Sequence, residues 1–279
     1  GLSFWSDDVT LEPLRGGLSN QSFVVTDNGR KYVARYGEDI PFHHVIRSRE
    51  LQISRAAAAL GLSPQVRFAA DGVMIFDFIE GATYTPEDVP PNLPKVVELI
   101  KKCHAEMHNY VRGPASLFWV FHVLRDYAHT LREGNSRMCP QLPRLMAIAE
   151  ELEAAAGEPT IAICHADLLA ANFIDDWEYG GFGNIWFDLG NVCAMSNFSR
   201  ATEAQLLSDY FGREPDEHDW RRLDAMCCAA HLRETMWAMV SEIHMVTDVD
   251  YEAYTAEQLT GFETAHARYR ERYGLPAPA

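Results

Sequence analysis

The feature that most constrains this chain of 279 residues is a polar segment placed directly after a short apolar run. Residues 160–164 are apolar enough to form a buried strand. They lead into His165 and Asp167, with Asn172 five residues after that acid and a second acid at Asp176. Phosphoryl transfer needs a carboxylate that orients and deprotonates a hydroxyl, plus an amide and a carboxylate that hold Mg²⁺. The pattern H-x-D-x-x-x-x-N fits that chemistry. The simpler alternative is a turn in which His165 and Asp167 satisfy backbone groups.

Composition and charge exclude several classes of protein. The hydrophobic content of 47% is enough for a substantial core, and no run approaches the ~18 apolar residues of a membrane span, so no membrane insertion is expected. The net charge of −16 argues against a nucleic-acid partner and is compatible with a cationic substrate. The six cysteines lack C-x-x-C spacing, and the acidic N-terminus does not read as a signal peptide. Both features favour a cytoplasmic protein with free thiols.

A glycine-containing turn is predicted near the N-terminus, within residues 14–25. Glycines let backbone N–H groups approach phosphate oxygens closely, and this turn contains Gly16, Gly17, Ser19 and Asn20. Asn28-Gly29 is a hairpin signal before a third strand at 31–36. A helix over 45–60 and two further strands at 66–69 and 73–78 follow. The proline-rich stretch 85–91 then indicates a boundary between two lobes, after which the periodicity becomes helical.

With the segment Asp176-Trp177-Glu178-Tyr179, these motifs resemble the choline/ethanolamine kinase and aminoglycoside phosphotransferase group. The resemblance covers residues 14–269, with four motifs in the same order. It implies an α+β fold that is bilobal and protein-kinase-like. Residues 1–81 would form a small N-terminal lobe, an antiparallel sheet with one helix. Residues 82–279 would form a larger, mainly helical C-terminal lobe that contains the catalytic and acceptor-binding residues.

The same resemblance implies a role for individual residues. Asp167 would be the catalytic base, and Asn172 and Asp176 would be the metal ligands. Arg35 would pair with the phosphates, Glu50 would pair with Arg35, and Asp188 would brace the catalytic loop by accepting backbone N–H bonds. The full set expected to bind the nucleotide is Gly16, Gly17, Ser19, Asn20, Arg35, Glu50 and the hinge residues Phe78 and Ile79; the set expected to bind the acceptor is Glu178, Glu234 and Trp237. Arg47 and Arg49, by contrast, are interpreted as solvated charges on a helix face.

Two departures from the family pattern bear on activity and substrate. In the family, the metal-binding Asn and Asp lie at opposite ends of a β-hairpin, which needs about 8 residues. Here only residues 173–175 separate Asn172 from Asp176, so the hairpin is either absent from the protein or missing from the sequence. The second departure is Glu234, which aligns with one of two tryptophans that bind trimethylammonium in eukaryotic choline kinases. Glu234 could instead contact a primary amine or a hydroxyl.

We therefore expect an ATP-dependent, Mg²⁺-requiring kinase that phosphorylates the hydroxyl of an amino alcohol such as choline or ethanolamine. An aminoglycoside, thiamine or another small alcohol is an alternative acceptor. If the short link is real, the alternative is a catalytically silent pseudokinase. A protein kinase is not expected, because the chain has no D-F-G or A-P-E segment. The oligomeric state is left open, a homodimer included.

Overall fold

The N-terminal part of the chain builds a five-stranded antiparallel sheet in the computed structural model, which describes residues 2–6, 9–14, 20–174 and 176–275. The strands lie in the order β1-β2-β3-β5-β4, and their bounds are β1 Thr10–Leu14, β2 Gln21–Asp27, β3 Arg30–Tyr36, β4 Val66–Ala70 and β5 Val73–Asp77. Asn28 and Gly29 take φ of 49° and 78° in the turn between β2 and β3. These left-handed conformations are the ones that Asn-Gly hairpins require, so the predicted hairpin is confirmed.

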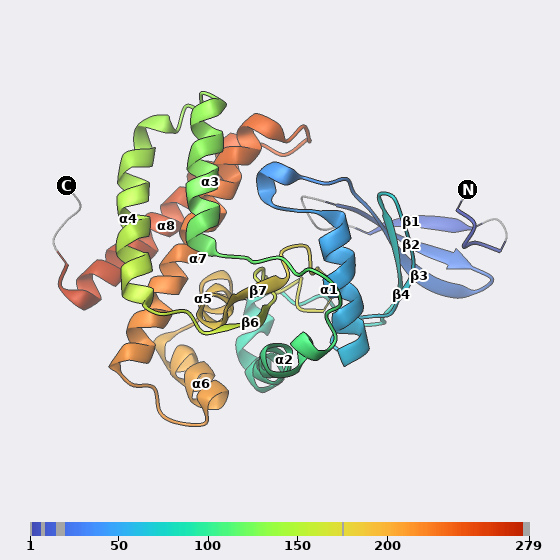
Figure 1. The fold of residues 1–279 in the computed structure, drawn as a ribbon, viewed down its shortest axis with the longest axis horizontal. Coiled ribbons are helices and arrows are strands. Elements are labelled where there is room, and N and C mark those ends of the chain that lie inside the picture. The colour runs from blue at the N-terminus through green and yellow to red at the C-terminus, as the bar shows by residue number, and fades with distance from the viewer. Residues whose placement is uncertain (1, 7–8, 15–19, 175, 276–279) are drawn as a thin grey trace.

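Helix α1 (Arg47–Leu60) lies between the sheet and the helical remainder of the molecule (Figure 1). Its buried face includes Ile53, Ala56 and Ala57, small and branched side chains that let it pack closely. It ends at Gly61, whose φ of 79° is the left-handed conformation common at a helix C-terminus. Because α1 lies between the two parts of the molecule, its polar residues lie there too.

The rest of the chain is mainly helical, as expected, and surrounds one short hairpin of strands. The helices are α2 Leu93–Glu106, α3 Val120–Glu133, α4 Leu142–Ala156, α5 Ile185–Met195, α6 Arg200–Phe211, α7 Glu217–His244 and α8 Tyr251–Tyr273; the short strands are β6 Ile161–Cys164 and β7 Gly181–Asn184. The antiparallel sheet followed by a mainly helical remainder confirms the predicted fold class. Among the described residues, no helix is both long and apolar enough to cross a bilayer.

Helix α7 is the centre of this helical part. It begins with a capping box in which the side chains of Asp216 and Asp219 each accept a backbone N–H of the other. It then packs against α3, α4, α5 and α8, so most of its side chains between Leu223 and Ser241 are buried. The approach to α5 is closest at Gly190, where a Cβ atom would lie 2.7 Å from the backbone of α7. A helix buried on nearly every side is a rigid support for functional side chains.

The short 3₁₀ turn Pro41–His43 carries His43 from the N-terminal part into the helical part. Its imidazole stacks on Trp237 with 4.5 Å between ring centroids, and Nε2 lies 2.9 Å from Oγ of Ser241. Burial, together with the positive charge of Arg233, lowers the pKa of His43 to about 2. The ring is therefore neutral in the folded protein across the physiological range.

This lowered pKa predicts acid sensitivity with a defined sign. As the pH falls below about 6.5, the unfolded chain protonates this histidine while the folded chain does not, so the folded state loses stability. We expect His43→Phe to reduce the slope of unfolding free energy against pH between 6.5 and 4.5 by up to ~1.4 kcal/mol per pH unit. Urea unfolding at a series of pH values measures this slope. An unchanged slope in the variant would contradict the prediction, and a variant of the exposed His129 controls for loss of a histidine.

Candidate functional site

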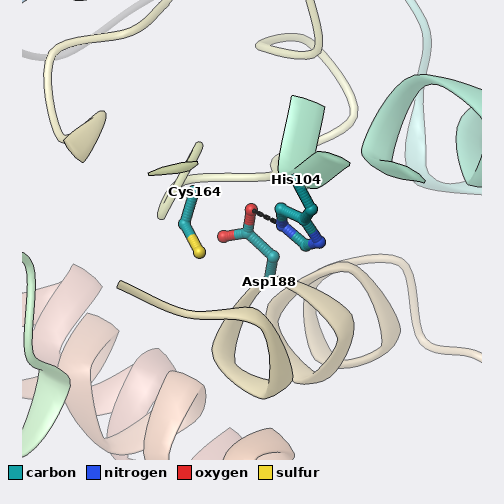
Figure 2. Close-up of side chains that lie close together, drawn as sticks. All are labelled: His104, Cys164 and Asp188. Carbon is teal, nitrogen blue, oxygen red and sulfur yellow. Dashed lines mark hydrogen bonds and ion pairs between the residues drawn. The ribbon is translucent and has the colours of Figure 1, made fainter. Parts of the chain in front are cut away.

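The loop predicted to be catalytic begins at His165, directly after β6, and is held by the carboxylate of Asp188 on α5. Its oxygens accept the backbone N–H groups of His165 and Ala166, each at 2.8 Å, and Nε2 of His104 lies 3.0 Å away (Figure 2). Ala166 adopts φ of 64°, an uncommon conformation for a residue with a Cβ, and its hydrogen bond to Asp188 helps to hold it. The expected bracing role of Asp188 is therefore confirmed by these contacts.

Figure 2 also shows the thiol of Cys164 beside this carboxylate. The ligand atoms of His104, Cys164 and Asp188 lie within 4.8 Å of one another, the spacing of a metal site. Burial raises the pKa of the Cys164 thiol, so the sulfur stays protonated, whereas a metal ligand must be a thiolate. The carboxylate is already occupied by three donors. The cluster is a hydrogen-bonded brace for the loop.

Asp167 is buried near the start of this loop, and each of its oxygens has a protein donor. Nη1 of Arg233 lies 3.1 Å from Oδ1, and Nδ2 of Asn172 donates to Oδ2 at 2.8 Å. Burial raises the pKa of Asp167 to about 6, while Arg233 opposes that shift and the charges of Glu234 and Asp176 add to it. A carboxylate with this pKa is ionised at neutral pH and can accept the proton of a nearby hydroxyl.

The second acid, Asp176, lies at the interface with the N-terminal sheet. Nη1 of Arg35 on β3 contacts Oδ1 of Asp176 at 3.1 Å and Oε1 of Glu50 on α1 at 2.9 Å. The structure thus brings Arg35, Glu50 and Asp176 together, in the pairing that the sequence predicts for Arg35 and Glu50. The short link has not separated Asp176 from this pair, although no strand forms among the described residues between Cys164 and Gly181.

Glu178 faces the same side as Asp176 and contacts polar groups from the N-terminal part. Arg47 donates to it at 3.2 Å, and so does Nδ2 of Asn20. Burial, with the charges of Asp176 and Glu50, raises the pKa of Glu178 to about 8. Arg47 also pairs with Glu50 at 2.6 Å and is largely buried, so its interpretation as a solvated surface charge is wrong.

These acids fit a magnesium ion by the chemistry of their donors. Mg²⁺ prefers carboxylate and amide oxygens, and Asp176 and Asn172 lie one turn apart, where the N–H of Asp176 approaches the carbonyl of Asn172 at 3.5 Å. Burial is the main cause of the raised pKa of Asp167 and of Glu178, and the negative charge of Asp176 adds to both shifts; a divalent cation would neutralise that charge. The assignment of Asn172 and Asp176 as the metal ligands stays a prediction.

A cavity of ≈ 440 Å³ opens between the sheet and the helical part, next to Arg35. Its lining includes the predicted hinge residues Phe78 and Ile79, along with Val33 and Val96. A mostly apolar slot with a guanidinium at one end suits an adenine ring whose phosphates extend toward the cation. Of the predicted glycine-rich turn, Asn20 is described, whereas Gly16, Gly17 and Ser19 lie outside the described residues.

On the other side of Asp167, helix α7 presents the residues predicted to contact the acceptor. Glu234 is buried, with one oxygen accepting Arg233 at 3.0 Å and the other accepting the hydroxyl of Tyr254 at 2.7 Å. The indole N–H of Trp237 donates to the hydroxyl of Tyr179 at 3.1 Å. The three predicted acceptor residues therefore divide: Glu234 and Trp237 lie together on α7, whereas Glu178 lies with Arg47.

Two arginines at the site were not predicted from the sequence as functional. Arg233 contacts Asp167, and Arg47 contacts Glu178, across 66 and 131 residues of chain. The available signals were weak: Arg47 precedes Glu50 by three residues, the spacing of a helical ion pair, and Arg233 stands beside Glu234 in a helical run that is mainly apolar on both sides. Neither pattern identifies the distant partner.

A substitution of Asp188 tests how much its hydrogen bonds to the loop stabilise the protein. Asp188→Asn keeps the size of the side chain but replaces one acceptor oxygen by an NH₂ group that faces a backbone N–H. We expect the free energy of unfolding to fall by about 3 kcal/mol, because a buried donor is left unpaired. His104→Phe, which removes one of the three donors and leaves the backbone bonds, is the matched control and should cost less. Equal stability of Asp188→Asn and the wild type in urea unfolding would contradict this.

Comparison with known proteins agrees with this geometry. Residues 10–225 match the model of the phosphotransferase enzyme family. Ethanolamine kinase 1 of Mus musculus is 22% identical, over 88% of this chain and 81% of its own length. The crystal structure of a choline/ethanolamine kinase family protein from Mesorhizobium loti aligns with a TM-score of 0.77 and 26% identity, over 96% of this chain and 90% of that one. LicA in complex with AMP aligns with a TM-score of 0.70 and 16% identity, over 94% and 95%.

The family match covers more than half of the chain, from β1 into α7, and includes Asp167, Asn172 and Asp176. The solved structures share the antiparallel sheet and the mainly helical remainder. The chain is a member of the phosphotransferase enzyme family.

Proposed function

We propose that the protein transfers the γ-phosphoryl group of ATP to the hydroxyl of a small amino alcohol. The observation that carries this proposal is the placement of Asp167. It lies between a cation–carboxylate group on the nucleotide side, formed by Arg35, Glu50 and Asp176, and an acid and aromatic group on the acceptor side. This is the arrangement that a transfer between two bound substrates requires.

Asp167 would bind the acceptor hydroxyl and take its proton as the oxygen attacks phosphorus. One bond forms between that oxygen and the γ-phosphorus, and the bond from the γ-phosphorus to the bridging oxygen of ADP breaks. Asn172 and Arg233 hold Asp167 in place through one hydrogen bond to each of its oxygens. Arg35 would neutralise phosphate charge, and Glu50 holds Arg35 in position. Mg²⁺ bound by Asn172 and Asp176 would supply further charge neutralisation at the phosphates.

The choice of substrates rests on the cavity, on charge and on the relatives. The hinge cavity suits adenine, and LicA binds AMP in its solved complex. The relatives are named for ethanolamine and for choline or ethanolamine. The buried carboxylate of Glu234 beside Trp237 offers an amine both a counter-charge and an aromatic face.

Asp167→Asn tests this function. We expect kcat for ATP-dependent phosphorylation of ethanolamine or choline to fall about 10²–10⁴-fold, because the amide cannot accept the proton. Binding of ATP with Mg²⁺ should be retained, since Asp167 lies on the acceptor side of the phosphates. Phosphoalcohol formation and calorimetric ATP titration measure the two quantities, and Glu133→Gln, at an exposed position, is the control.

Two outcomes would argue against the proposal. An Asp167→Asn variant with unchanged turnover would show that another group activates the hydroxyl. ATP·Mg²⁺ binding by the wild type without turnover on any alcohol would favour the pseudokinase, in which the short link between Asn172 and Asp176 prevents productive metal binding.

A further inference from the structure

The acceptor side of the site contains a group of aromatic side chains, which we define as the aromatic cluster: Tyr179, Trp237, Tyr251 and Tyr254. The ring of Trp237 lies edge-to-face against Tyr251 and Tyr254, with centroids 6.1 and 6.4 Å apart. Its N–H is bonded to the hydroxyl of Tyr179. Such a group of electron-rich rings is what a protein uses to bind a quaternary ammonium.

Two rings of this cluster, those of Tyr179 and Trp237, already carry a group of the same chain on one face. The guanidinium carbon of Arg233 lies 4.4 Å from the centroid of Tyr179, in the position of a cation over a ring. His43 stacks on Trp237 with 4.5 Å between centroids and 19° between planes. The protein therefore supplies its own cation to the ring of Tyr179.

Arg233 is not free to leave this position. It is 3% exposed and pairs through Nη1 with both Asp167 and Glu234, at 3.1 and 3.0 Å. The attraction of Asp167, Tyr179 and Glu234 outweighs the effect of burial and keeps the pKa of Arg233 above its usual value. Moving the guanidinium aside would leave two buried carboxylates without their cation.

A trimethylammonium group and a primary ammonium group would make different contacts with these side chains. Trimethylammonium is bulky, carries no N–H donor and relies on ring faces, and Arg233 and His43 already occupy one face each of Tyr179 and Trp237. A primary ammonium is small and donates hydrogen bonds. Each oxygen of Glu234 accepts a hydrogen bond from a protein group, one from Arg233 and one from Tyr254, and a carboxylate oxygen has a second lone pair that an ammonium can use.

We propose that Arg233 determines acceptor selectivity: its guanidinium occupies the cation position of the aromatic cluster, so the enzyme selects a primary amino alcohol over its trimethylated counterpart. This rests on the proposed kinase function. Ethanolamine and choline are the chemically matched pair, because they differ only in the three methyl groups on nitrogen. Arg233 acts as a specificity residue through the space and charge that it occupies, with no covalent role.

The experiment measures kcat/KM for ethanolamine, its N-methyl and N,N-dimethyl derivatives, and choline. For the wild type we expect a stepwise fall along the series, with ethanolamine at least tenfold better than choline. In Arg233→Met the ratio should move toward choline by tenfold or more, even if activity on every acceptor falls. Arg47→Met, which removes a cation from the nucleotide side, is the matched control: it should lower activity on all acceptors and leave the ratio unchanged.

A second variant and a second readout separate selectivity from folding and from catalysis. Arg233→Met/Glu234→Gln removes the cation without leaving Glu234 charged and unpaired, and it should also favour choline. Calorimetric titration of ethanolamine and choline in the presence of a non-hydrolysable ATP analogue and Mg²⁺ reports selectivity without turnover. Selective binding of ethanolamine without phosphorylation would support the role of Arg233 while refuting the kinase function. A wild type that prefers choline, a ratio unchanged in both variants, or binding of neither alcohol would overturn the proposal.

Discussion

The rest of the site depends on the hydrogen bonds that the carboxylate of Asp188 accepts. It joins three elements at one point: α5, which carries it, α2, which supplies His104, and the backbone of the catalytic loop. The loop needs this support because Ala166 is held at a positive φ. Asn191, one helical turn further along α5, accepts the N–H of Leu168 at 2.6 Å. The position of Asp167 is therefore set by two side chains of one buried helix.

The charged residues around Asp167 form two separate groups, one toward the proposed nucleotide site and one toward the proposed acceptor site. On the nucleotide side, Arg35 and Arg47 each contact more than one acid, and the group joins strand β3, helix α1 and the segment after the loop. On the proposed acceptor side, Arg233 of the buried helix α7 pairs with two acids, Asp167 of the loop and Glu234 of the same helix. The first group connects the two parts of the molecule. The second belongs to the core of one part and is rigid.

Local patterns in the sequence predict much of this structure. They do not predict ion pairs between residues that are far apart in the chain. The Asn28-Gly29 hairpin depends on the φ preferences of two adjacent residues, and it forms as predicted. The pairing of Arg35 with Glu50 follows from motif order in a known family, and the two lie 2.9 Å apart. Arg233 could not be assigned in this way: the resemblance places its helical segment at the acceptor pocket, but nothing in the sequence links it to Asp167, which is 66 residues away. The placement of Glu178 against Arg47, rather than beside Trp237, has the same cause.

The burial of helix α7 limits how proteins with this fold can change their acceptor preference during evolution. The side chains that we propose face the acceptor, Arg233, Glu234 and Trp237, are also interior side chains of a helix packed against four others. In many enzymes substrate range changes through surface loops, which tolerate substitution at little thermodynamic cost. Here a new acceptor preference must be obtained by altering the interior, where most substitutions destabilise. A lineage must therefore first accumulate stabilising substitutions elsewhere before its acceptor range can change, and the pace of that change follows its reserve of stability.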